Sequence, residues 1–254
     1  MTCRCKSYPG TPTLLRHNIM QLKNGQESHP LLGRIKQFDE RSRQFPIRSL
    51  VEGKVSRSYT WRCMAHHNQG SEGACVGFGI AHELRARPSE VEGVTSFMAR
   101  DIYLEAQKID PWPGGSYPGA YPQYEGTSVL AGIKVAQKMG YFDSYRWAFG
   151  LHDLMLGVGY NGPAVLGVPW YEGMFDIDNK GFIHATGRIM GGHCILCKSV
   201  NIKKNYFILH NSWGLGWGNG GDCYISFQDM STILANDGEA AFMLHRHKVA
   251  QPLP

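Results

Sequence analysis

The sequence predicts an α+β fold made of two halves, a helical half followed by a half built from strands. Apolar residues recur near helical spacing in three segments of the first half, residues 75–87, 94–108 and 127–139. The second half holds short apolar runs between glycine-rich turns, typical of buried strands, at residues 164–168, 193–196, 206–209 and 223–227. A chain of 254 residues is long enough for both halves to pack as one domain.

Residues 1–44 are predicted to form a basic N-terminal arm, because turn-forming residues interrupt any sustained periodicity there. Residues 1–62 hold 12 lysines and arginines and four acidic residues, a net charge of +8 in a chain whose total is +5, so the remainder carries −3. We expect a solvated arm, and contact with a nucleic acid or an acidic partner would involve only this basic region. The apolar piece Leu31–Ile35 is expected to dock on the body, and our hypothesis for the arm is regulation or tethering. Cys3 and Cys5 do not have a common zinc-finger spacing, which leaves open whether they bind a metal.

The remainder, residues 45–254, is predicted to be one folded unit. Its helical lobe covers about residues 60–145, and its strand lobe covers about residues 146–254. A strand is expected at residues 58–61 and a short helix at residues 152–158.

The composition argues against a membrane protein, because no apolar run approaches the roughly 20 residues that span a bilayer. The first residues lack the apolar core of a signal peptide, and the seven cysteines form no obvious disulfide framework. We therefore expect a cytoplasmic, monomeric protein with reduced thiols, or a virion-associated one if a phage encodes it.

One cysteine and three polar residues stand in contexts that suggest nucleophilic catalysis. Cys75 is predicted to open a helix, where the unpaired N–H groups and the dipole favour a thiolate, and Gln69 lies six residues earlier. His193 follows two glycines at a predicted strand start, and Asn211 follows a predicted strand. A thiol nucleophile needs a base, and that base needs an acceptor on its other nitrogen, so this set suits acyl transfer.

These segments resemble those of the papain family (C1-type) of cysteine peptidases. The segment Gln69–Cys75 is similar to the family's Q-G-x-C-G-S-C-W segment, and Gly191–His193 resembles its G-x-H element. Asn211–Gly218 matches N-S-W-G-x-x-W-G almost fully. The resemblance covers roughly residues 45–245. It implies a two-lobed fold in which a central helix begins at the nucleophilic cysteine and a β-barrel-like antiparallel lobe faces it across an active-site cleft.

The resemblance also implies the role of each residue. The catalytic residues would be the nucleophile Cys75, the base His193, its orienting partner Asn211 and the oxyanion-hole donor Gln69. The substrate-binding residues would be Gly126, Thr127, Gly192, Cys194 and Trp213. Peptides or proteins would be the substrates, and neither a cofactor nor a metal is implied.

Three positions depart from the family pattern. Glu72 stands where many secreted members have a disulfide cysteine, Val76 replaces the usual tryptophan after the nucleophile, and Cys194 replaces a small residue after the base. The overall pattern is closer to bacterial or phage-borne members than to lysosomal ones. The same site would also serve an isopeptidase or an acyl transferase, and a non-catalytic binding or structural module is a further alternative.

Overall fold

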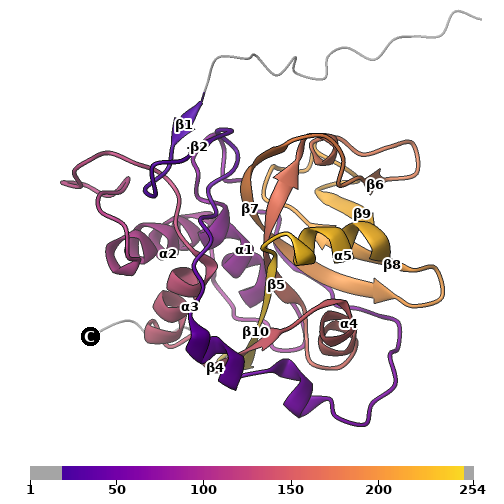
Figure 1. The fold of residues 1–254 in the computed structure, drawn as a ribbon. Coiled ribbons are helices and arrows are strands. Elements are labelled where there is room, and N and C mark those ends of the chain that lie inside the picture. Colours follow the sequence, from indigo (N-terminus) through magenta and orange to yellow (C-terminus); the bar gives the residue numbers. More distant parts are fainter. Residues whose placement is uncertain (1–18, 249–254) are drawn as a thin grey trace, which may run out of the picture.

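Three helices pack together on one side of the molecule in the computed structural model, which describes residues 19–248 (Figure 1). They are α1 (Cys75–Leu84), α2 (Ser96–Ile109) and α3 (Val129–Lys138), close to the predicted bounds. Thr95 and Ser128 cap α2 and α3, because each side chain accepts a hydrogen bond from a backbone N–H of the first turn.

A mixed sheet forms the other side of the molecule, with the strand order β4-β10-β5-β7-β8-β9-β6 and with β3 paired to β7. Its strands are β3 (Tyr59–Thr60), β4 (Phe142–Ala148), β5 (Ala164–Tyr171), β6 (Phe182–Ile183), β7 (Ile189–Asn201), β8 (Tyr206–His210), β9 (Asp222–Ser226) and β10 (Glu239–Arg246). The helices α4 (Leu151–Tyr160) and α5 (Phe227–Ala235) and the short 3₁₀ helix η3 (Glu172–Met174) lie between these strands in the chain.

The antiparallel sheet predicted for this half is confirmed, but in the part of the chain that the structure describes it does not form a closed barrel. Within residues 19–248 the sheet does not close, because its edge strands β4 and β6 are not paired with each other. The short strand β6 also pairs with β9 in parallel, whereas the other pairings are antiparallel. The expected segregation of helices and strands holds for the main elements.

Strands β4 and β10 and helix α5 lie outside the predicted segments. Polar residues interrupt β4, so it lacks the apolar run that marked the other strands. It is held instead by antiparallel pairing with β10, for example Trp147 opposite Ala241. Because this pairing joins segments far apart in the sequence, no local pattern shows it.

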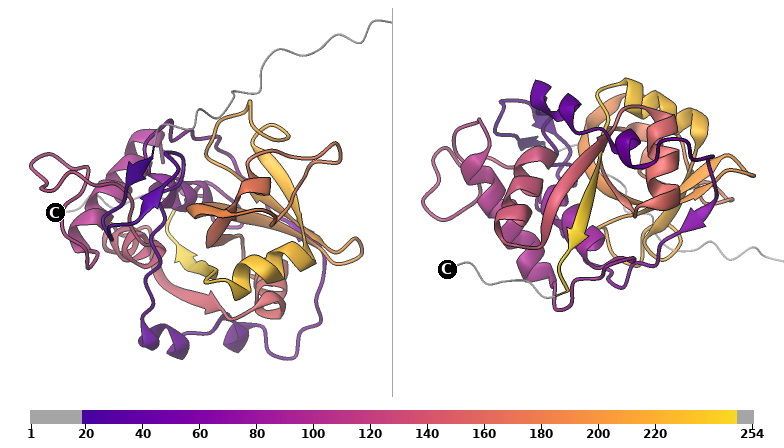
Figure 2. Two further views of the ribbon diagram at one scale, coloured as in Figure 1. Left: turned by 45° about the horizontal axis from the view of Figure 1, so that its top comes forward. Right: turned by 90° about the horizontal axis from the view of Figure 1, so that it is seen from below.

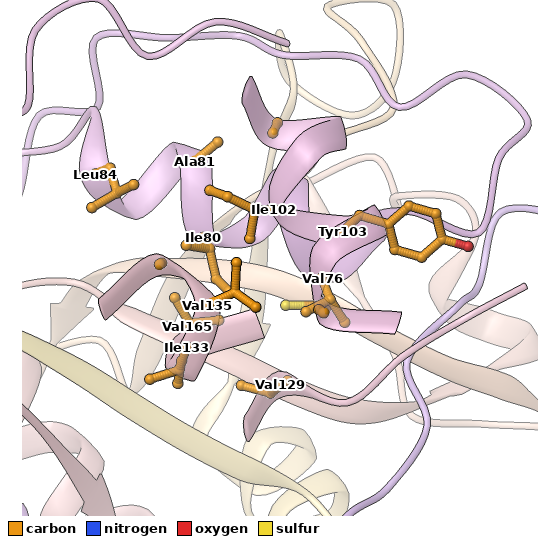
Figure 3. Packing of buried hydrophobic residues seen from close by; sticks show 14 of the residues in the cluster. Val76, Ile80, Ala81, Leu84, Ile102, Tyr103, Val129, Ile133, Val135 and Val165 are labelled. Carbon is orange, nitrogen blue, oxygen red and sulfur yellow. The ribbon is translucent and has the colours of Figure 1, made fainter. Parts of the chain in front are cut away.

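Helix α1 lies at the centre of the molecule, and all ten of its residues are buried. Figure 3 shows Val76 and Ile80 of this helix packed with Ile133 of α3 and Val165 of β5. A Cβ atom at Gly77 would lie 2.1 Å from the carbonyl oxygen of Ala99, so this glycine allows α2 to approach closely. The surrounding core fixes where the helix begins, and the residue at that end is Cys75.

Residues 19–36, which we name the strap, run between the helices and the sheet. The strap begins with a small hairpin, β1 (Met20–Gln21) and β2 (Glu27–Ser28), and then descends between α2 and α3 on one side and β5 and β7 on the other (Figures 1 and 2). Leu32 and Ile35 are buried, so the apolar piece docks on the body. Two short 3₁₀ helices follow, η1 (Glu40–Gln44) and η2 (Ile47–Leu50).

Candidate active site

Cys75 begins α1 and is fully buried. The backbone N–H groups of Gly33, in the strap, and of Cys194, in β7, lie beside its thiol. The site therefore brings together the start of the central helix, the strap and the strand residue that follows His193. The side chain of Cys194 packs toward α1, since a Cβ atom at Gly79 would lie 2.7 Å from the Cys194 Sγ.

His193 and Asn211 form a direct hydrogen bond across β7 and the end of β8. The His193 Nε2 lies 2.8 Å from the Asn211 Oδ1, which also accepts from the Ser212 backbone N–H at 2.8 Å. Because an amide oxygen only accepts, the Nε2 carries the proton. The Nδ1 has no hydrogen-bond partner in the described part of the chain, so it is available as a base.

Two tryptophan rings flank the imidazole of His193. The ring centroids of Trp170 and Trp213 lie 4.7 Å and 4.8 Å from it, and Phe175 stacks on Trp213 at 5.7 Å. Trp213 was predicted to be a substrate-binding residue, and its ring lies beside the base. Trp170 and Phe175 lie outside the matched motifs, so no local pattern predicts that Trp170 lies beside the base or that Phe175 stacks on Trp213.

The side chain of Gln69 is oriented by Ser212, a contact that sequence reasoning missed. The Ser212 hydroxyl donates to the Gln69 Oε1 at 2.7 Å, and the Gln69 backbone N–H donates to the Ser212 carbonyl at 2.9 Å. The amide nitrogen then donates to the carbonyl oxygens of Glu72 at 2.8 Å and of Leu31, in the strap, at 3.2 Å. The Leu31 carbonyl of the strap therefore accepts a hydrogen bond from the Gln69 amide, the group that was predicted to donate to the oxyanion.

The turn that carries the nucleophile is anchored by charged side chains. Arg100 of α2 donates to both carboxylate oxygens of Glu72, from Nε at 2.8 Å and from Nη2 at 3.0 Å. The Gly73 backbone N–H donates to the Glu125 carboxylate. At the position where the resemblance places a disulfide cysteine, this chain therefore has an ion pair to α2.

The protonation of the site differs from the expected thiolate. Burial raises the pKa of Cys75 to about 11, although the backbone N–H groups of Gly33 and Cys194 oppose this effect. Burial also lowers the pKa of His193 to about 4, although the hydrogen bond to Asn211 opposes this effect. A charged pair would lose its hydration here, so the thiol and the imidazole are both neutral near pH 7. The unpaired N–H groups and the dipole at the start of α1 favour a thiolate, but this effect is too small to offset the burial.

The backbone positions predicted to bind substrate hold the strap instead. The Thr127 N–H donates to the Gly33 carbonyl at 2.9 Å, and the Ile35 N–H donates to the Thr127 carbonyl at 2.8 Å. On the opposite side the Arg34 N–H donates to the Gly192 carbonyl at 2.9 Å.

The space beside Gly126 is also filled, because a Cβ atom there would lie 2.8 Å from the Gly33 carbonyl oxygen. The predicted substrate positions Gly126, Thr127 and Gly192 therefore contact one continuous segment of the chain itself.

Two buried basic side chains fix the strap to acidic partners in the body. Lys23 donates to Asp110 Oδ1 at 2.6 Å, and both side chains are fully buried. Arg34 pairs with Glu239 at 2.6 Å, also out of solvent for the most part. The positive charge of this region therefore meets acids of the body, which lowers the charge left for a nucleic acid.

Within residues 19–248, no group of three or more His, Cys, Asp or Glu side chains is arranged to hold a metal ion. Cys3 and Cys5 lie outside the described residues. No helix in residues 19–248 has both the length and the apolar character needed to cross a membrane.

His210, the residue before Asn211, joins the strand half to the segment that precedes the nucleophile. Its Nδ1 lies 2.6 Å from Asp222 Oδ1, and its Nε2 lies 2.9 Å from the Ala65 carbonyl oxygen. Both partners accept, so both ring nitrogens carry protons and the ring is charged. Burial alone would lower the pKa of His210, but the hydrogen bonds to Asp222 and Cys63 outweigh it and raise the pKa to about 9.

We expect the contribution of His210 to the free energy of unfolding to fall by about 2 kcal/mol as the pH rises from about 7.5 to about 9.5. The folded pKa of His210, about 9, exceeds the unfolded value. Its stabilisation is therefore complete below about pH 6.5 and is lost as the pH rises through about 9. Glu83 titrates mostly below this window, because burial raises its pKa to about 7. Urea unfolding should show a clearly shallower fall for His210→Gln, and parallel curves for the two proteins would contradict the prediction.

No protein-family model matches the chain. Among solved structures, xylellain, a cysteine protease from Xylella fastidiosa, is 16% identical over 89% of this chain and 98% of its own, with a TM-score of 0.58. Procathepsin B S9 from Trypanosoma congolense is 14% identical over 87% of each chain, with a TM-score of 0.49. The bromelain protease from Ananas comosus is 17% identical over 76% of this chain and 100% of its own, with a TM-score of 0.46. The likeness to xylellain spans nearly all of both chains, and the chain therefore has the fold of the papain-like cysteine proteases.

Proposed function

We propose that this chain is a cysteine-type peptidase that hydrolyses peptide bonds with Cys75 as its nucleophile and His193 as its base. The observation that carries the proposal is the 2.8 Å hydrogen bond between His193 Nε2 and Asn211 Oδ1, which leaves Nδ1 unprotonated. This imidazole lies in the strand that also presents the Cys194 amide to the Cys75 thiol. The papain-like fold supports the same function.

The reaction follows from these groups. The Cys75 sulfur bonds to the carbonyl carbon of the substrate while its proton passes to the His193 Nδ1. The Gln69 amide and the Cys75 N–H donate to the oxyanion, and His193 then protonates the departing amine as the C–N bond breaks. Water, deprotonated by His193, attacks the resulting thioester, and the S–C bond breaks to release the acid and the thiol. Asn211 keeps the imidazole in the required tautomer throughout.

In the strapped form the proposed peptidase is latent. Cys75 and His193 are both fully buried, and the strap engages the positions proposed to bind substrate. The neutral thiol is a poor nucleophile, because the thiolate is the reactive species. Release of the strap would return water to the site. Because burial is the largest cause of both shifts, we expect the pKa of Cys75 to fall and that of His193 to rise toward their ordinary values, although the loss of the Gly33 N–H and the Arg34 charge opposes the fall for Cys75.

The test is covalent labelling of the full-length chain with a peptide carrying an epoxide or vinyl sulfone, followed by peptide mapping. We expect one labelled residue, Cys75, and faster labelling when the strap is weakened. Equal labelling of wild type and Cys75→Ala would refute the assignment of the nucleophile. Profiling with linear and isopeptide-linked substrates then separates reaction classes, since a dedicated isopeptidase would leave linear peptides intact.

A further inference from the structure

Two stretches of the chain that contain no acidic residue meet where β3 pairs with β7. The sequence has no aspartate or glutamate in residues 53–71 or in residues 179–221. The antiparallel pairing of Tyr59 with Val200 brings these two stretches together. The fold therefore places basic residues of both stretches along one edge of the sheet, and neither stretch supplies a carboxylate to pair with them.

Short contacts join the loop before β3, the end of α4 and the turn between β7 and β8. The Tyr160 hydroxyl donates to the Val55 carbonyl at 2.8 Å, and the Ile202 backbone N–H donates to the Ser58 hydroxyl at 2.9 Å. In both Figures 1 and 2 the loop before β3 runs beside the turn after β7. These segments form one surface, which we name the cationic face and which consists of Lys54, Arg57, Tyr59, Tyr160, Lys203 and Lys204.

The four basic side chains of the cationic face make no ion pair with any acidic residue within residues 19–248. All four residues are exposed. By contrast, Lys23 and Arg34 of the strap are both paired with acids of the body. The cationic face therefore carries positive charge that the described chain does not neutralise, and its electrostatic complement is an anionic partner.

Two tyrosine rings lie among these charges. The guanidinium carbon of Arg57 lies 4.1 Å from the centroid of the Tyr160 ring and 5.3 Å from that of Tyr59. The Lys54 Nζ lies 4.5 Å from the Tyr160 centroid. Tyr59 is 41% exposed, and its ring centroid lies 4.2 Å from that of the buried Trp61. The Tyr59 ring therefore packs on a buried ring and presents aromatic surface to solvent beside positive charges.

We propose that the cationic face binds single-stranded nucleic acid. The four charges contact phosphates, and the Tyr59 ring with the neighbouring Arg57 guanidinium provides a surface on which an unpaired base stacks. A single strand fits better than a duplex, because the bases of a duplex are already stacked on one another. It also fits better than an acidic peptide, since carboxylates would pair with the charges and leave the ring without a partner. This binding is separate from the proposed peptidase function, because none of these residues belongs to the site around Cys75.

The first experiment measures binding of the full-length chain to a fluorescent single strand of about 16 nucleotides, by anisotropy at several salt concentrations. Lys203→Gln/Lys204→Gln should weaken binding about 10-fold near 0.1 M salt. The slope of log Kd against log salt concentration should also fall by about 1.4, because each phosphate contact on a single strand contributes about 0.7.

Lys134→Gln/Lys138→Gln is the matched control for this double substitution. It removes the same charge from α3, which lies on the other side of the molecule from the turn between β7 and β8 (Figure 1). Its affinity should stay within about 3-fold of wild type, and the slope should not change. An equal loss of affinity in the two variants would overturn the proposal, because it would show that only the total charge matters.

The second experiment tests the aromatic surface. Tyr59→Leu keeps apolar bulk against Trp61 but removes the ring, so binding of the single strand should weaken at least about 5-fold. Tyr59→Phe keeps the ring and should bind as wild type does. A polyglutamate peptide of matched charge should bind more weakly than the single strand and should not respond to Tyr59→Leu. Unchanged binding of the single strand by Tyr59→Leu, or tighter binding of polyglutamate or of a duplex of the same length, would refute the assignment.

Discussion

Replacing Cys75 by alanine is expected to reduce kcat/KM for peptide hydrolysis by at least about 10⁴-fold, because no other group can form the thioester. The measurement needs a parent chain with a weakened strap, since the strapped form offers little activity to lose. His193→Ala in the same parent should be about as inactive, because the base and the nucleophile act as a unit. Combining the two substitutions should cost little more than either one.

Cys223→Ala is the matched control for this prediction. Cys223 in β9 is also a fully buried thiol, but it belongs to the core of the strand half. Its loss should leave kcat/KM within about 3-fold, since it removes only a few core contacts. Substantial hydrolysis by Cys75→Ala, with Cys223→Ala unchanged, would place the chemistry elsewhere.

The sequence was sufficient to predict the helices α1, α2 and α3 and to single out the polar residues proposed for the site, for physical reasons. The spacing of apolar residues in α1 is typical of a buried helix, and all ten of its residues are buried. Its glycines indicate that a neighbouring element approaches closely, as the backbone at Ala99 does. Asn211 stands in a run of small and aromatic residues that local sequence can identify. Its hydrogen bond to His193 is the contact that the resemblance implied.

The features that could not be predicted from the sequence depend on contacts between segments that are far apart in the chain. The pairing of β4 with β10 and the seating of Arg34 against Glu239 join segments up to 205 residues apart. The neutral state of Cys75 also depends on the surrounding fold, because burial raises its pKa more than the Gly33 N–H and the Arg34 charge of the strap lower it. A helix start alone predicts the opposite direction.

The second large effect is expected from Gly33→Ala, which adds one methyl group to the strap and should raise the rates of peptide hydrolysis and of Cys75 labelling. A Cβ atom at Gly33 would lie 1.8 Å from the Gly73 carbonyl oxygen and 2.4 Å from its carbon. Both atoms are backbone in the turn that carries Cys75, which Arg100 and Glu125 hold in place. Gly33→Ala must therefore displace the strap, at a cost of about 1 to 3 kcal/mol. If strap release limits activity, peptide hydrolysis and Cys75 labelling should both rise by about 5- to 150-fold.

Gly216→Ala tests whether the effect belongs to the strap, because a Cβ atom at Gly216 meets no neighbouring atom within 4 Å. Its rates should match those of wild type. Burial is the largest influence on the pKa of Cys75 and raises it to about 11, whereas the Gly33 N–H and the Arg34 charge of the strap lower it. We expect the return of water to outweigh the loss of these two groups, so the released chain should gain a thiolate at lower pH. The rate of labelling plotted against pH should therefore shift to lower pH in Gly33→Ala. Faster labelling without that shift would mean that the strap blocks access only, and unchanged rates would mean that it does not restrain the site.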